Sequence, residues 1–101
     1  MASSQKLEYV LTVTTILGKS QEHNYPLSNN REEALKRVRE VARSVVQALA
    51  GKSNLPLVLL QNPVTLYRTT HIVSVSPHFR GPEAQIEPIE QAALGFLSRE
   101  R

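Results

Sequence analysis

The sequence predicts a single α+β domain with the element order β-β-α-β-β-β-α. We expect a mostly antiparallel sheet packed against a long central helix and a C-terminal helix. Three patterns predict this: apolar residues at helical spacing between Asn30 and Gly51, alternating apolar and polar residues from Leu7 to Leu17, and a second helical pattern in residues 81–101. A chain of 101 residues has room for one core, so residues 1–101 should form one domain, with residues 1–5 and 98–101 frayed.

The central helix is expected from Asn30 to Gly51. Its apolar residues recur at steps of three and four, and they are Leu35, Val38, Val41, Ala42, Val45, Val46 and Leu49. Asn29 or Asn30 can cap the helix at its start, each with a glutamate three residues later. Gly51 stands where a left-handed C-terminal cap is expected.

Alternation predicts a first strand over Leu7–Leu17. One face of this strand should be buried, and it carries Leu7, Tyr9, Leu11, Val13 and Leu17. Gly18–Ser20 predicts a short loop. Gln21–Leu27 predicts a returning edge strand, because proline at position 26 suits an edge or a strand end.

Three further strands are expected after the helix. Leu57–Leu60 is apolar at four consecutive positions, which predicts a strand inside the sheet with both faces covered. Asn62–Pro63 predicts a turn. Val64–Tyr67 and His71–Ser76 predict a hairpin about residues 68–70.

Residues 81–101 predict the second helix, with Pro88 as its first helical residue. Its apolar face should comprise Ile89, Ala92, Ala93, Phe96 and Leu97. From the central helix onward, the order α-β-β-β-α resembles that of double-stranded-RNA-binding domains. However, Glu83, Glu87 and Glu90 stand where such a domain needs basic residues for phosphates. The resemblance is therefore limited to element order and identifies no family.

Composition excludes several classes of protein. Hydrophobic residues make up 41% and charged residues 21% of the chain, which is typical of a folded soluble protein. The chain has no cysteine, which excludes disulfides, a thiolate nucleophile and cysteine-based metal sites. The polar N-terminus does not read as a signal peptide and no apolar run is long enough to cross a bilayer, so we expect a cytoplasmic protein with no membrane partner.

The net charge of +3 is concentrated in residues 31–52. Lys36, Arg37, Arg39 and Arg43 could bind nucleic-acid phosphates, with Arg68 and Arg80 as possible additions. Glutamates at positions 32, 33 and 40 interrupt this basic face, and two of them lie four residues before a cation. A solvated, salt-bridged face is therefore the favoured interpretation.

Polar residues elsewhere give one candidate ligand site. Arg68, Thr69, Thr70 and His71 could bind a small anion, although a turn whose threonines satisfy local backbone groups is favoured. We expect His71 to begin the core-facing row of its strand, ahead of Val73 and Val75. The His78 side chain should lie on the opposite face of the strand. These two histidines are too far apart along an extended chain to share a metal ion.

No catalytic constellation is visible. The chain has no nucleophile elbow, no glycine-rich phosphate loop and no dinucleotide fingerprint, so we expect no enzyme, no metal and no cofactor.

The outer face of the sheet should also carry apolar residues. These are Val10, Ile16 and Ile72, together with either Val58 and Leu60 or Leu57 and Leu59 from the middle strand. If both helices cover the other face, these residues form an exposed patch suited to self-association. The leading hypothesis is a small non-enzymatic interaction module of a bacterial or mobile-element accessory type, acting as a homodimer or on a protein partner. The alternatives are nucleic-acid binding on the central helix and anion binding at residues 68–71.

Overall fold

The computed structural model describes residues 6–51 and 56–99, with side chains up to residue 92. Its elements are β1 (Glu8–Thr15), β2 (Ser20–Pro26), α1 (Arg31–Leu49), β3 (Leu57–Leu60), β4 (Thr65–Arg68), the 3-10 turn η1 (Thr69–His71), β5 (Ile72–Arg80) and α2 (Glu83–Arg99). The predicted α+β class and element order are confirmed. The predicted fraying of residues 1–5, 100 and 101 lies outside the described residues, and residues 98 and 99 belong to α2.

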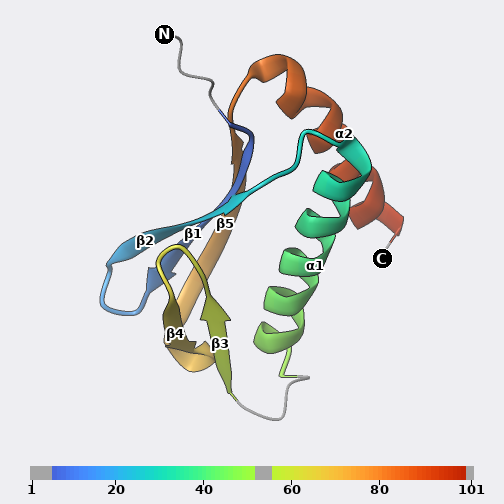
Figure 1. The fold of residues 1–101 in the computed structure, drawn as a ribbon. Helices are drawn as coiled ribbons and strands as arrows, with labels where there is room; N and C mark the ends of the chain where they lie inside the picture. Colours follow the sequence, from blue (N-terminus) through green and yellow to red (C-terminus); the bar gives the residue numbers. More distant parts are fainter. Residues whose placement is uncertain (1–5, 52–55, 100–101) are drawn as a thin grey trace, which may run out of the picture.

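A three-stranded antiparallel sheet has the order β2-β1-β5 (Figure 1). On its inner face Tyr9, Leu11 and Val13 of β1 are buried, as predicted. Leu17 does not join this row. It is 78% exposed because β1 ends at Thr15 and Gly18, with φ of +80°, turns the chain back into β2.

The strands β3 and β4 form a separate antiparallel hairpin. The predicted hairpin between residues 64–67 and 71–76 is therefore wrong. The turn η1 carries the chain from one sheet to the other, because the Thr69 N–H bonds the Pro56 carbonyl at 2.9 Å while the His71 carbonyl accepts from Ile16 at 2.9 Å. β3 is consequently an edge strand, not an interior one.

The long helix α1 confirms the main sequence prediction. The Asn30 side chain caps it by accepting from the backbone N–H groups of Glu32 and Glu33, and Gly51 follows it with φ of +73°. Its buried residues are Ala34, Val38, Val41, Val45 and Ala48. Val46 and Leu49, which were expected in the apolar stripe, are exposed, because the stripe that meets the sheet is rotated toward the two alanines.

The second helix, α2, packs against α1 and β5 on the inner side of the three-stranded sheet (Figure 1). Ile89 is buried with Leu7 and Ala34 in a small second core. The predicted start at Pro88 is wrong: the helix begins at Glu83, and Pro88 lies inside it. The side chains of the predicted face beyond Ala92, those of residues 93, 96 and 97, lie outside the described residues.

Candidate functional site

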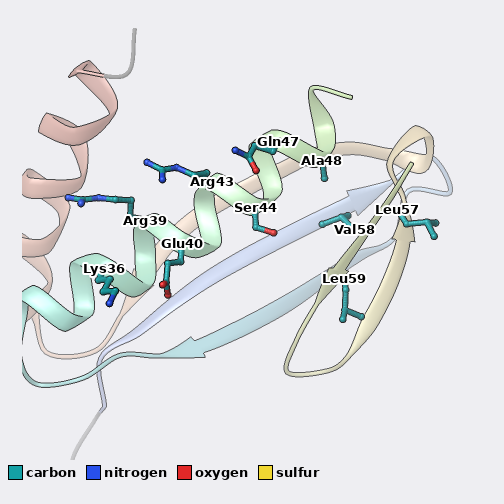
Figure 2. Close-up of a pocket in the computed structure, with 10 residues that line it drawn as sticks. All are labelled: Lys36, Arg39, Glu40, Arg43, Ser44, Gln47, Ala48, Leu57, Val58 and Leu59. Carbon is teal, nitrogen blue, oxygen red and sulfur yellow. The ribbon is translucent and has the colours of Figure 1, made fainter. Parts of the chain in front are cut away.

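The described surface is hollowed between α1 and β3, where an open groove of about 890 Å³ separates the helix from the hairpin (Figure 2). A smaller hollow of about 150 Å³ adjoins it and shares Glu40, Ser44 and Leu59 as lining residues. Together the two hollows follow α1 over most of its length on one side and β3 on the other. Both walls belong to secondary-structure elements, so the groove is a feature of the fold.

The helical wall of the groove is polar. Glu40, Ser44 and Gln47 are spaced by four and three residues, which aligns them along one stripe of α1. Figure 2 shows Glu40 and Ser44 pointing toward the strands, whereas Arg39 and Arg43 project away from the hairpin. The helix therefore offers the groove a carboxylate, a hydroxyl and an amide, with cations along its outer flank.

The strand wall is the unpaired edge of β3. Because the Pro56 carbonyl is bonded to Thr69, the antiparallel alternation makes Val58–Tyr67 and Leu60–Thr65 the hydrogen-bonded pairs. The N–H and C=O groups of Leu57 and Leu59 consequently point away from β4. Among the described residues, no hydrogen bond reaches these groups.

A buried histidine holds the hairpin on the sheet. His23 is 0% exposed, and its Nδ1 lies 3.2 Å from the Gln61 carbonyl and 3.0 Å from the Pro63 carbonyl. Carbonyls only accept hydrogen bonds, so Nδ1 is the donor to both of them, and Nε2 forms a hydrogen bond of 2.6 Å with the Tyr67 hydroxyl. Burial raises the pKa of the Tyr67 hydroxyl, and a hydrogen bond with the Thr65 side chain lowers it by a smaller amount.

The hairpin turn also covers the outer edge of β2. The Asn24 N–H donates to the Asn62 carbonyl at 3.2 Å, and the Asn62 side-chain amide donates to the Asn24 carbonyl at 2.7 Å. The Tyr25 hydroxyl accepts from the Gln61 N–H at 3.0 Å. These bonds fix the hairpin beside α1 and so set the position of the groove. The sequence identified Asn62–Pro63 as a turn but gave His23 no role. The residues that His23 joins lie far from it in the sequence, and no neighbouring motif identifies them.

The four cations predicted to bind nucleic acid lie around this groove. Lys36, Arg39 and Arg43 line its larger part, and the Arg37 guanidinium lies 5.4 Å from the centre of the Tyr25 ring in the smaller part. Glu40 stands among them. The structure therefore places these residues along one side of a groove, and nucleic-acid binding there stays a prediction.

The predicted anion site lies on the exposed turn η1 and its flank. The Thr69 hydroxyl donates to the Pro56 carbonyl at 3.3 Å, so one of the four side chains has a local role, as the structural interpretation expected. Arg68, Thr70 and His71 are exposed. The expectation that His71 faces the core is wrong, because the chain is still turning at this residue and β5 begins after it. Anion binding stays a prediction.

The predicted patch of Val10, Ile16 and Ile72 does not exist as an exposed surface. Val10 is fully buried, since Asn24 and His78 flank it on the neighbouring strands and the Arg80–Glu22 ion pair of 3.1 Å spans the sheet beside it. Ile72 packs against the core. Ile16 alone of the three is strongly exposed.

The outer face of the β3–β4 hairpin carries a different apolar surface. Of its residues, the sequence placed only Leu59 on an outer face, as one of two alternatives. Leu59 and Leu66 are opposite each other in the register and are 55% and 61% exposed, and Val64 beside them is 75% exposed. We call these three residues the hairpin face. The signal that could have found it is the apolar run 57–60, whose alternate residues face the core and the solvent.

Within the described residues, no three histidine, aspartate or glutamate side chains gather in a way that could hold a metal ion. None of the described helices combines the length and apolarity needed to cross a membrane. No family model, curated protein or solved structure matches the chain.

Proposed function

We propose that this chain is a small non-enzymatic interaction module that associates through the hairpin face, with a second copy of the chain as its partner. The observation that carries this proposal is the exposed Leu59–Leu66 pair with Val64 beside it. Contiguous exposed apolar side chains on a folded surface typically mark an interaction site.

The chemistry of the other uncovered surface supports this choice. On the outer face of the three-stranded sheet, Thr14 bonds Ser20 and Arg80 bonds Glu22. These polar groups satisfy one another and remain hydrated, so burying them against a second protein would bring little gain. The hairpin face instead presents side chains that lose unfavourable contact with water when they are covered.

The shape of the hairpin face suits a symmetric dimer. A pair of short strands with apolar side chains on one side can pack against the same surface of a second copy across a two-fold axis. Because few apolar residues contribute, the dimer should be weak and should depend on concentration.

Leu66→Lys tests the proposal. The exposed position tolerates lysine without loss of core packing, but the charge must be desolvated when two hairpin faces meet. We expect the wild-type mass in sedimentation to rise from 11.3 kDa toward twice that value with concentration, and the Leu66→Lys mass to stay at the monomer value.

Leu17→Lys is the matched control, because Leu17 is also exposed but lies in the β1–β2 turn. It should associate as the wild type does. A wild-type chain that stays monomeric at millimolar concentration would contradict the proposal, and so would loss of association in Leu17→Lys alone.

A second candidate function is nucleic-acid binding, which the clustering of Lys36, Arg39 and Arg43 along the groove favours. If three cations each neutralise a phosphate of a single strand, log K should fall against log salt with a slope of about −2. Fluorescence anisotropy with a labelled single-stranded oligonucleotide measures this slope. Lys36→Glu should weaken binding and the exposed Lys19→Glu should not; equal effects would indicate non-specific attraction and would count against this function.

A further inference from the structure

We propose that the turn between β1 and β2 docks on a membrane surface, with Ile16 and Leu17 entering the outer boundary of a bilayer that carries anionic phospholipid headgroups. We call residues 15–19 the tip. The tip shares no residue with the hairpin face, and its action does not require self-association. Surface docking needs a short apolar tip and no spanning segment. It therefore goes beyond the expectation of no membrane partner, which rested on the lack of such a segment.

The tip is a tight loop with apolar side chains where polar ones are usual. The Thr15 N–H donates to the Lys19 carbonyl at 3.0 Å and the Gly18 N–H donates to the Thr15 carbonyl at 2.9 Å, as in a three-residue hairpin loop. Glycine, proline, asparagine, aspartate and serine dominate such turns. Here Ile16 and Leu17 occupy the corner positions and are 60% and 78% exposed. The end of the β1–β2 hairpin therefore presents two large aliphatic side chains (Figure 1).

The backbone of the tip is already hydrogen-bonded within the protein. Besides the two loop bonds, the Ile16 N–H donates to the His71 carbonyl at 2.9 Å. At the base of the tip, the Thr14 and Ser20 hydroxyls bond each other at 2.9 Å. Polar groups that enter a bilayer without partners are costly, so these bonds lower the cost of removing the tip from water.

The charge around the tip is complementary to an anionic surface. The bond from the tip to the His71 carbonyl places residues 14–20 beside residues 68–74 at one end of the sheet. These two segments contain Lys19 and Arg68 but no aspartate or glutamate. Both cations are exposed, and within the described part of the chain no ion pair reaches either of them. Each lysine or arginine close to an anionic bilayer strengthens its binding.

A bilayer fits this surface better than other occupants do. A folded partner would need a matching cavity to bury the corner side chains of the tip, whereas a fluid bilayer closes around them. Val73, 64% exposed on β5 where the register with β1 shifts, adds an aliphatic side chain beside the tip. A second copy of the chain would bring Lys19 and Arg68 toward the same cations, which is unfavourable. A nucleic acid would attract the cations but leave Leu17 in water.

The test uses a tryptophan placed at the tip, because the chain contains none of its own. The fluorescence of Leu17→Trp should shift to the blue when vesicles of equal parts phosphatidylserine and phosphatidylcholine are added. Brominated phosphatidylcholine in these vesicles should quench it. Val46→Trp is the matched control, since Val46 is also exposed but lies on α1, and its fluorescence should not change.

Cosedimentation with the same vesicles measures binding without a tryptophan. Leu17→Ser should lower the partition constant about tenfold or more, because each buried methylene group contributes to insertion, and Val46→Ser should leave it unchanged. Lys19→Gln should lower the constant about fivefold, the usual contribution of one cation near an anionic surface. Lys36→Gln on α1 makes the same change of net charge and should lower it less. All four side chains are exposed, so the fold should persist.

The inference is overturned if anionic vesicles leave the Leu17→Trp fluorescence unshifted, or if Leu17→Ser and Val46→Ser lower the partition constant equally. Equal binding to vesicles with and without phosphatidylserine would also overturn it. Self-association in lipid-free solution that Leu17→Ser abolishes would assign the tip to a second copy instead. Leu66→Lys separates this inference from the proposed function, because that variant should remain monomeric and still bind anionic vesicles.

Discussion

His23→Ala should lower the free energy of unfolding by about 3 to 4 kcal/mol, from the combined cost of a core cavity and unpaired buried polar groups. The substitution leaves the carbonyls of Gln61 and Pro63 and the Tyr67 hydroxyl without their shared partner. It also empties a site at which the side chain is completely enclosed. Urea denaturation followed by circular dichroism measures the loss.

Tyr67→Phe is a milder variant for comparison with His23→Ala, because it removes one hydroxyl and keeps the ring that packs edge-on to His23. It should cost about 1 to 2 kcal/mol, the usual penalty for leaving one buried polar atom, here Nε2 of His23, unpaired. If His23→Ala costs no more than Tyr67→Phe, His23 does not hold the hairpin on the sheet.

Gly81→Ala is expected to cost about 2 to 3 kcal/mol, which combines the strain of a glycine-only backbone conformation with a steric clash. Gly81 has φ of +144°, and a Cβ added there would lie 2.9 Å from the Leu7 Cα and 3.1 Å from the Lys6 carbonyl oxygen. Both neighbours are backbone atoms, so neither can move aside as a side chain could. The chain passes from β5 into α2 at this residue, against the start of β1.

Gly51→Ala separates the cost of the backbone conformation from the cost of the steric clash. Gly51 has φ of +73°, but an added Cβ would meet no atom within 4 Å. The expected cost is about 1 kcal/mol, from the left-handed backbone alone. Thermal and urea unfolding of both variants provides the comparison, and equal losses would show that the close approach of Leu7 to Gly81 contributes nothing.

Sequence patterns predicted the parts of this fold that depend on local spacing. Three features were predicted correctly: the cap at Asn30, the glycine that follows the helix at position 51, and the buried row of β1. Each depends only on residues that are close together in the sequence. The helix stripe was predicted in part: Val38, Val41 and Val45 are buried, whereas Val46 and Leu49 are exposed. Its exposed Val46 shows why: the spacing fixes a stripe, but the opposing surface decides which of its residues are covered.

Strand pairing could not be predicted in the same way. The apolar run at residues 57–60 reads equally well as an interior strand or as one with Leu59 exposed, and only the separate hairpin decides between them. The structural role of His23 could likewise not be predicted, since its partners lie 38 to 44 residues away along the chain. The groove depends on both features, so its cations could be anticipated but its strand wall could not.

The proposed self-association uses the hairpin face of Leu59, Val64 and Leu66. Isotope-filtered nuclear Overhauser spectra of an equal mixture of labelled and unlabelled chains test it most directly. We expect intermolecular contacts among the methyl groups of these three residues. Intermolecular contacts confined to Ile16, Leu17 and Val73, or none at millimolar concentration, would contradict it.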